Sequence, residues 1–414
     1  TLLSLLPPVQ NVLLQGRILT QAVYRDLTGQ IPAQVEPPVA LVQIDEESIR
    51  KAKISVPNPI DRGYLADLID RLSMSEARII GINYLLDRQQ PDRDPLLARS
   101  LRQAVANRGV WFVFAAELNN GQEIGLAPEA CPDSSNWSLQ GYTNASPAYL
   151  KLPSARDCAA SCPFASVLSV VYALDRSTST ANLPPPQLTD RTDCRTQLFK
   201  YFHQENNPNA TISFLRKIEL YPLPGLVETI GQNWFRPIND FSLPPNLVYS
   251  SVPAWQLLDR NGTNFPLSDR FKQQIVIIAP GGYQEAGVIP GSNNFPSPWA
   301  VKYWRERFGW ENQHFTGSEI FAYSIHQLLN RQLIIPIPEL LVIAIAGLTG
   351  KIITRQLSKG DLRTILGLAS STVAYSFIAW QMYLWAGIIL PILLPSAVFW
   401  IYVLPSFKPT KAHE

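Results

Sequence analysis

Charged residues are scarce in this chain of 414 residues, and neither sign of charge dominates. Asp, Glu, Lys and Arg make up 16% of the sequence, and the formal net charge is +2. Soluble domains average about 25% charged residues, and nucleic-acid-binding domains carry a marked basic excess. The composition therefore argues against a nucleic-acid partner and indicates a chain that is partly removed from water.

Catalytic signatures are also missing. The sequence has no nucleophile elbow, no zinc-binding H-E-x-x-H, no phosphate-binding P-loop and no G-x-G-x-x-G for a dinucleotide. Histidine occurs only four times, and we interpret His326 as structural because it lies among apolar residues of a helical pattern. We therefore predict no cofactor, no metal site and no enzymatic activity for these residues.

Long apolar runs are confined to residues 336–405, where we predict three transmembrane helices in a lipid bilayer. The runs are Leu340–Thr354, Thr364–Leu384 and Trp385–Leu404. A span takes about 20 apolar residues, which the second and third runs provide. The alternative is a buried hairpin in a globular core, which we disfavour because protein rarely buries runs of this length.

Basic residues predict the orientation of these helices. Six of them flank the first loop or follow the third helix: Lys351, Arg355, Lys359, Arg363, Lys408 and Lys411. Because Lys and Arg are enriched in cytoplasmic loops, both regions are assigned to the cytoplasm. The sequence thus predicts a multi-pass protein of the cell membrane, with residues 31–335 outside the cytoplasm and a cytoplasmic tail at 406–414.

The four cysteines all fall in the predicted outer region, at Cys131, Cys158, Cys162 and Cys194. An even number of cysteines in an oxidising compartment predicts disulfides, here two. The pairing stays open, because four cysteines allow three connectivities. Four reduced cysteines are the alternative.

Hydrophobic patterning of the outer region predicts an α/β fold with a mostly parallel, doubly wound sheet. Four buried strands are predicted, at Val39–Ile44, Ala77–Tyr84, Val110–Ala116 and Gln274–Ala279. Helices are predicted after the first two strands, at Arg62–Leu72 and from Asp94 onward. Such alternation of strands and helices is typical of a doubly wound sheet.

Two segments depart from this alternation. Residues 118–212 are loop-like and hold all four cysteines, so we predict a disulfide-containing insertion with one helix near Phe164–Leu174. Residues 1–30 are predicted to be a linker, and the leucines at 2–6 are also typical of the end of a transmembrane helix.

Ligands of doubly wound sheets bind beyond the carboxyl ends of the strands. The polar residues at those ends include Asp45, Glu46, Asn83, Asp87 and Tyr283. We predict that they line a ligand-binding site, whose acidic character favours a cationic or hydroxyl-rich ligand. The alternative, and the commoner role, is that the acidic residues after the first strand cap a helix.

Four motifs occur in order along the chain. They are Ala-Leu-Val-Gln-Ile-Asp-Glu-Glu-Ser-Ile at 40–49, Pro-Ile-Asp-Arg-Gly-Tyr-Leu-Ala-Asp-Leu-Ile at 59–69, Ala-Arg-Ile-Ile-Gly-Ile-Asn-Tyr-Leu-Leu-Asp at 77–87, and Phe-Thr-Gly-Ser-Glu-Ile-Phe-Ala-Tyr-Ser-Ile-His-Gln-Leu-Leu-Asn at 315–330. Together they resemble the type-two CHASE domain, a bacterial extracytoplasmic sensory module, over most of residues 15–335. One departure is Asn83, where family members usually carry Asp; a role that needs a second carboxylate there is in doubt.

The resemblance implies a function. It implies a membrane-anchored sensory module that binds an unknown ligand or partner outside the cytoplasm and signals to an output domain that these residues do not contain. In cyanobacteria-like architectures that domain is often an N-terminal, caspase-like CHAT domain. A homodimer is compatible with this function. The alternative is a membrane-anchored extracytoplasmic α/β enzyme with a carboxylate site, and the missing catalytic signatures favour the sensor.

Overall fold

The chain divides into two compact units in a computed structural model. The sheet unit combines Pro32–Tyr221 with Asn239–Gln332, and the helical unit combines Thr1–Ile31, Pro222–Ile238 and Leu333–Glu414. The structure describes residues 7–33, 36–120, 122–128, 130–144, 148–152, 158, 161–176, 184–189, 192–203, 209–219, 235–259, 271–283, 286, 293–310, 314–356 and 362–407.

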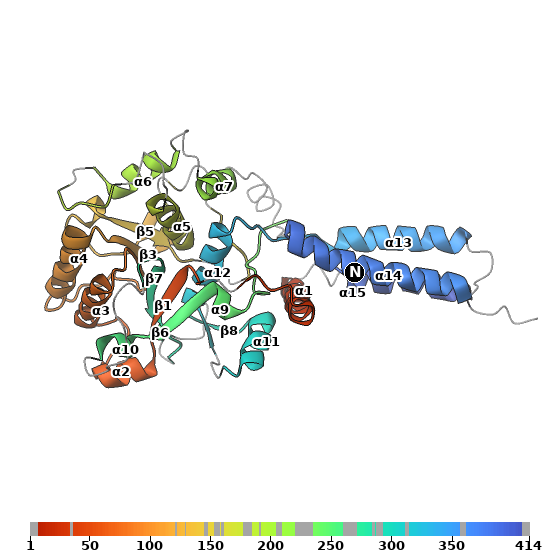
Figure 1. Cartoon of the computed structure of the whole chain (residues 1–414), viewed down its shortest axis with the longest axis horizontal. Helices are drawn as coiled ribbons and strands as arrows, with labels where there is room; N and C mark the ends of the chain where they lie inside the picture. The colour runs from red at the N-terminus through yellow and green to blue at the C-terminus, as the bar shows by residue number, and fades with distance from the viewer. Residues whose placement is uncertain are drawn as a thin grey trace, which may run out of the picture. The chain divides into compact units, whose positions relative to one another are not determined.

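A seven-stranded sheet forms the centre of the sheet unit (Figure 1). Its strands are β1 (Val39–Ile44), β2 (Ile79–Ile82), β3 (Trp111–Asn119), β4 (Gln122–Ile124), β5 (Ser138–Tyr142), β6 (Tyr249–Pro253) and β7 (Ile275–Pro280). Their order is β4-β3-β2-β7-β1-β6, and β5 pairs with β3. The β3–β4 pairing is antiparallel and the others are parallel, which confirms the predicted mostly parallel α/β sheet.

Strand β7 lies between β1 and β2 and runs parallel to both. The C-terminal ends of these three strands therefore lie at one edge of the sheet. The Gly281 N–H donates to the Ile44 carbonyl over 2.8 Å, and the Asn83 N–H donates to the Ile278 carbonyl over 2.8 Å. The polar residues after β1, β2 and β7 therefore share the carboxyl edge of the sheet, as the sequence predicts.

Helices cover both faces of the sheet (Figure 1). On one side lie α3 (Arg62–Met74) and α4 (Asp94–Arg108), and on the other α5 (Phe164–Asp175) and α12 (Gly317–Leu329). Gly81 in β2 sets the closeness of α5, because a Cβ there would lie 2.9 Å from the Phe164 ring. A doubly wound arrangement results, since apolar side chains of a strand point to both faces.

Shorter elements complete the sheet unit. They are α2 (Glu46–Ala52), η2 (Ser134–Asn136), α6 (Cys194–His203), α7 (Ala210–Glu219), α9 (Pro245–Val248), α10 (Ala254–Leu258), β8 (Asn294–Pro296), α11 (Trp299–Phe308) and β9 (His314–Thr316). The helix predicted near Phe164 is confirmed as α5. The stretch predicted as a loop-like insertion also supplies β5, so part of it belongs to the central sheet.

The described residues contain one disulfide, Cys158–Cys162, and the prediction of a second one is wrong. Cys131 is a buried thiol, 1% exposed, in the apolar core beside α4 and Trp137. Cys194 is buried at the start of α6. The reason for the difference is packing: a buried thiol behaves as a small apolar side chain, which sequence spacing does not reveal.

The helical unit contains α1 (Pro7–Thr28), β10 (Ile335–Pro336), α13 (Glu339–Gln356), α14 (Leu362–Ala386), β11 (Ile388–Ile389), α15 (Leu393–Val403) and η4 (Leu404–Phe407). Among the described residues, one helix is long and apolar enough to cross a membrane, over Arg363–Ala386. Helix α13 contains three charged residues, Glu339, Lys351 and Arg355, and α15 has only 11 residues because β11 precedes it. The other two predicted spans therefore stay predictions.

Close contacts hold the helical unit together. Gly350 of α13 lies against α15, since a Cβ there would be 3.1 Å from the Tyr402 Cβ atom. Tyr24 of α1 stacks on Trp380 of α14 with 4.9 Å between ring centroids. The Gln381 amide donates to the Tyr24 hydroxyl over 2.6 Å. Residues 7–28, predicted as part of a linker, thus form a helix that packs on α14.

Candidate functional site

Asp45 has the capping role that we weighed as the alternative to ligand binding. Its carboxylate accepts hydrogen bonds from the Ser48 N–H over 2.8 Å and from the Ser48 hydroxyl over 2.6 Å, so it is the N-cap of α2. Glu46 follows in the first turn of α2 and is exposed to solvent. Negative charge at this end of a helix is stabilising, which accounts for the acidic cluster.

The other three predicted residues share the edge but have different surroundings. Asn83 is 4% exposed, and the nitrogen of its side-chain amide has no hydrogen-bond partner among the described residues. Tyr283 is 2% exposed, and its carbonyl accepts from the Asn294 amide over 2.9 Å. Asp87 is exposed on the loop after β2. Ligand binding by these residues stays a prediction, because the two cavities described below are lined by others.

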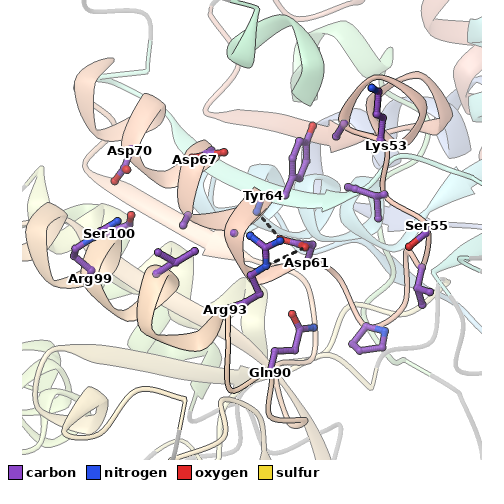
Figure 2. A pocket seen from close by; sticks show the side chains of 17 residues that line it. Lys53, Ser55, Asp61, Tyr64, Asp67, Asp70, Gln90, Arg93, Arg99 and Ser100 are labelled. Carbon is purple, nitrogen blue, oxygen red and sulfur yellow. Dashed lines mark hydrogen bonds and ion pairs between the residues drawn. The ribbon is translucent and has the colours of Figure 1, made fainter.

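A polar cleft of about 760 Å³ lies between α3, α4 and the loops that precede them (Figure 2). The residues that line it include three carboxylates and three cations, together with hydroxyl and amide groups: Lys53, Ser55, Asp61, Asp67, Asp70, Gln90, Arg93, Arg99 and Ser100. Helices that follow parallel strands begin at the carboxyl edge. The first residues of α3 and α4, which line part of the cleft, therefore lie toward that edge.

The start of α3 forms one wall of the polar cleft. Asp61 is the N-cap of α3 and accepts from the Tyr64 N–H over 2.9 Å. Arg93 reaches across from the loop before α4, with 3.9 Å between its Nε atom and the Asp61 carboxylate. Gly63 makes room for both, because a Cβ there would lie 3.0 Å from Asp61 and 3.2 Å from Arg93. Both side chains are partly exposed, so they remain available to a ligand at little energetic cost.

A buried ion pair anchors the loop that carries Arg93. Arg62 is fully buried, lies 3.4 Å from the Asp94 carboxylate, and donates to the Arg88 carbonyl over 2.9 Å. Asp94 also accepts from the Gln90 N–H over 2.7 Å. Burial lowers the pKa of Arg62, and Asp94 opposes that shift. Helix α4 begins at Asp94, as predicted, but its carboxylate binds this loop instead of capping the helix.

A second cavity of about 520 Å³, the tryptophan pocket, lies between α2, α3 and α10. Its lining residues are Ser48, Lys51, Ala52, Tyr64, Asp67, Trp255, Leu258 and Asp259. Three of these, Ala52, Tyr64 and Asp67, also line the polar cleft. The two cavities are therefore neighbours on one surface of the sheet unit.

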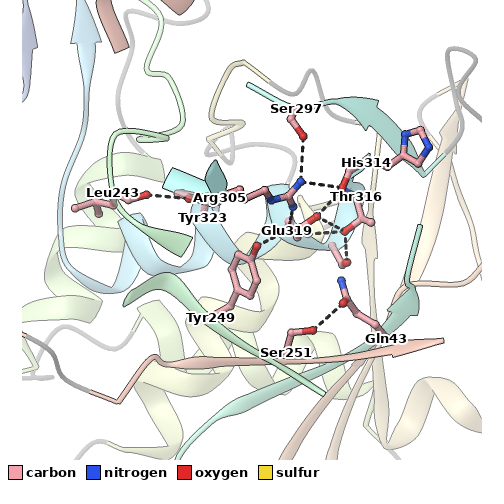
Figure 3. Close-up of polar contacts among 11 residues, drawn as sticks. Gln43, Leu243, Tyr249, Ser251, Ser297, Arg305, His314, Thr316, Glu319 and Tyr323 are labelled. Carbon is pink, nitrogen blue, oxygen red and sulfur yellow. Dashed lines mark hydrogen bonds and ion pairs between the residues drawn. The ribbon is translucent and has the colours of Figure 1, made fainter. Parts of the chain in front are cut away.

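A buried polar network ties α12 to the rest of the sheet unit (Figure 3). Arg305 and Glu319 form an ion pair at 2.5 Å, and the Tyr249 hydroxyl also donates to Glu319. Glu319 completes a capping box with Thr316 at the start of α12. Burial alone would lower the pKa of Arg305, but the charge of Glu319 raises it instead.

Sequence reasoning missed the residues that build these features. Arg62 and Asp61 lie in the motif at 59–69, and Glu319 lies in the motif at 315–330. The capping pattern Thr-x-x-Glu at 316–319 could have been found from spacing alone.

The fold and its cavities define the class of protein: an α/β domain with a ligand-sized polar cleft, followed in the chain by an apolar helical block. A family model described as the CHASE2 domain matches residues 2–352, and the chain therefore belongs to the CHASE2 family. This is a family of extracellular sensory domains, which fits a role other than catalysis. No curated protein and no solved structure matches the chain.

Proposed function

We propose that this chain is a membrane-anchored sensory module that binds a polar ligand in the cleft between α3 and α4. The observation that carries the proposal is the place of α12. Within the sheet unit this helix packs against β1, β6 and β7. Along the sequence, only residues 330–338 separate it from α13 of the helical unit. A shift of α12 on ligand binding would therefore be passed along the backbone to the helical unit, and from there to an output domain.

The apolar surface of the helical unit supports three membrane helices. Large apolar side chains are exposed on each of α13, α14 and α15: Leu341, Ile345, Leu348, Ile352, Leu366, Val373, Phe377, Ile378, Leu393 and Ile401. Soluble proteins rarely expose apolar patches of this extent, whereas lipid would bury them. The basic residues described above support a cytoplasmic position for the loop after α13 and for the C-terminus.

The polar cleft also supports a sensory function. It offers both carboxylates and cations on side chains that are partly exposed, as with Asp61 and Arg93. Such a lining suits a small ligand that carries charges of both signs or several hydroxyl groups. A ligand shifts a two-state protein only if it binds one state more tightly. Ligand binding in the cleft must therefore favour one arrangement of α3, α4 and the sheet.

A covalent surrogate for the ligand tests this proposal. Ser55→Cys places a thiol in the cleft, and Gln356→Cys places one at the far end of α13; both positions are exposed. The Ser55→Cys thiol is first modified with a charged methanethiosulfonate, and the labelling rate of Gln356→Cys is then measured in membrane vesicles. We expect a change of several-fold in that rate. Asn107→Cys, exposed near the end of α4, replaces Ser55→Cys as the control and should cause no change. The proposal is contradicted if modification of Ser55→Cys changes the labelling rate of Gln356→Cys no more than modification of Asn107→Cys does.

A further inference from the structure

We propose that the tryptophan pocket binds a small organic cation, whose ammonium group takes the position that Lys51 now occupies on the Trp255 ring. Three independent features of the pocket lead to this assignment: the ring with its bound cation, the carboxylates around it, and a buried hydroxyl group without a partner.

The Trp255 ring already holds a cation. The Lys51 ammonium nitrogen lies 3.1 Å from the centroid of the ring, and 3.5 Å from the Glu47 carboxylate. The face of an indole ring attracts cations, and Trp is the strongest of the aromatic side chains in this respect. The Lys51 side chain is 42% exposed, so it can leave the ring for water at little cost. Lys51 thus acts as a replaceable occupant.

Three elements contribute carboxylates to the pocket or to the Lys51 ammonium beside it. Glu47 lies on α2, Asp67 on α3 and Asp259 directly after α10; the last two line the pocket. The remaining space of about 520 Å³ is much larger than an ammonium group. It falls in the range of cavities that hold small-molecule ligands. The negative charges select a cation, and the volume admits one with an organic body.

Tyr64 supplies the feature that points most directly to a ligand. Its side chain is 9% exposed, and its hydroxyl oxygen has no hydrogen-bond partner among the described residues. Figure 2 shows the ring pointing away from Asp61 and Arg93. Ser48 lies near that hydroxyl, but the Ser48 hydroxyl donates to Asp45 and accepts from the Trp255 N–H, and it makes no hydrogen bond with Tyr64. A buried polar group without a partner is costly, and a bound ligand would satisfy it.

The Tyr64 hydroxyl stays protonated while it does so. Burial raises its pKa to about 12, so it carries no charge at neutral pH. It can donate to an acceptor on the ligand or accept from an ammonium N–H. The site therefore resembles an aromatic cage for a cation, with one neutral hydrogen-bonding group and a rim of carboxylates.

This inference goes beyond the proposed sensory function, because it holds whether or not binding moves the helices. The competing interpretation is that Lys51 merely rests its aliphatic stem on a surface tryptophan, as lysine side chains commonly do. The two differ in what happens when Lys51 is removed. If Lys51 occupies a ligand site, its removal should raise the affinity of that site for an organic cation. If Lys51 makes only a surface contact, its removal should produce no binding.

Calorimetric titration of the full chain in a maltoside detergent tests the inference, with tetramethylammonium chloride as the probe and sodium chloride as the ionic-strength control. We expect saturable binding of tetramethylammonium to the wild type. Lys51→Met should bind it several-fold more tightly, because the internal competitor is gone. Lys302→Met is the control: it removes the same charge from an exposed position on α11 that lines neither cavity, and should leave the affinity unchanged.

Two further variants show where the probe binds. Trp255→Leu should weaken binding at least tenfold, whereas Trp255→Phe keeps an aromatic face and should retain part of the affinity. Asp67→Asn should weaken binding several-fold. Melting temperatures confirm that each variant is folded. The inference is overturned if neither the wild type nor Lys51→Met binds tetramethylammonium, or if folded Trp255→Leu binds it as well as the wild type does. Failure here would leave the sensory proposal standing, since the thiol experiment does not use this pocket.

Discussion

Arg305 of α11 and Glu319 of α12 form an ion pair at 2.5 Å in which both side chains are almost fully buried. Removing one partner leaves the other charged and buried without compensation. We expect Glu319→Ala to lower the free energy of unfolding by about 3–5 kcal/mol. Urea unfolding of the full chain in detergent, monitored by tryptophan fluorescence, measures the change in the free energy of unfolding.

A surface ion pair on the same helix provides the control for this prediction. Lys302 and Glu306 of α11 lie 3.8 Å apart, and their side chains are 67% and 68% exposed. Glu306→Ala should cost less than about 1 kcal/mol, because exposed pairs are screened by water. Similar losses in both variants would show that the Arg305–Glu319 pair does not hold α12 in place.

Asp45→Ala should lower the stability of the protein. The Asp45 carboxylate caps α2, and the loss of an N-cap costs about 1 kcal/mol. Asp45→Asn preserves an acceptor and should restore most of that loss, and Glu46→Ala at the neighbouring exposed position should change little. Thermal unfolding of the three variants provides the comparison. If Asp45→Ala and Glu46→Ala melt at the same temperature, the cap does not contribute.

Cys131 should resist modification in the folded protein. It is 1% exposed, and burial raises the pKa of its thiol to about 11. Alkylation requires the thiolate, so an alkylating reagent at pH 8 should modify Cys131 only after unfolding in urea. Mass spectrometry of non-reduced peptides should also show Cys158 linked to Cys162. Rapid alkylation of Cys131 in the native protein would refute the burial described here.

Acidification should destabilise the sheet unit partly through His326. Burial lowers the pKa of this residue to about 4, and the nearby Asp240 opposes the shift. In the unfolded chain a histidine titrates near 6.5, so between about pH 6.5 and 4 the unfolded state binds more protons than the folded state. The contribution of His326 to the free energy of unfolding is therefore constant above about pH 6.5. As the pH falls toward 4, this contribution decreases by about 1–3 kcal/mol.

The variant His326→Gln isolates this contribution. Its free energy of unfolding should fall less steeply between pH 6.5 and 4 than that of the wild type, while other titrating groups affect both proteins alike. Urea unfolding at several pH values gives the two slopes. Parallel slopes would mean that His326 is as readily protonated in the folded state as in the unfolded chain.

Continuous apolar strands were predictable because their pattern is local. The bounds of β1 agree with the prediction, and β7 differs from it by one residue at each end. Strands β5 and β6 were missed. Their sequences, Ser-Leu-Gln-Gly-Tyr and Tyr-Ser-Ser-Val-Pro, are short and half polar, and they become strands only by pairing with β3 and β1. The position of β7 between β1 and β2 is likewise a long-range property.

A site at the carboxyl edge of the sheet stays a prediction, and the residues that line the two cavities are not those that the sequence pointed to. The carboxyl edge follows from the alternation of strands and helices. The side chains of the cleft do not, because Arg93 reaches Asp61, and Arg62 reaches Asp94, across a whole strand and helix. Asp45 illustrates the same limit, because a carboxylate that follows a strand gives the same sequence pattern whether it caps a helix or binds a ligand. Only the bond to Ser48 distinguishes the two roles.

The orientation of the chain in the membrane is the central claim, because a sensory module must present its ligand site outside and its output end inside. Thiol labelling in spheroplasts tests it with Asn107→Cys in the sheet unit and Gln356→Cys at the end of α13, both exposed. The native cysteines give little background, since two form a disulfide and the others are buried. A membrane-impermeant maleimide should label Asn107→Cys at once and Gln356→Cys only after the membrane is permeabilised. Immediate labelling of Gln356→Cys together with protection of Asn107→Cys would reverse the orientation and contradict the account.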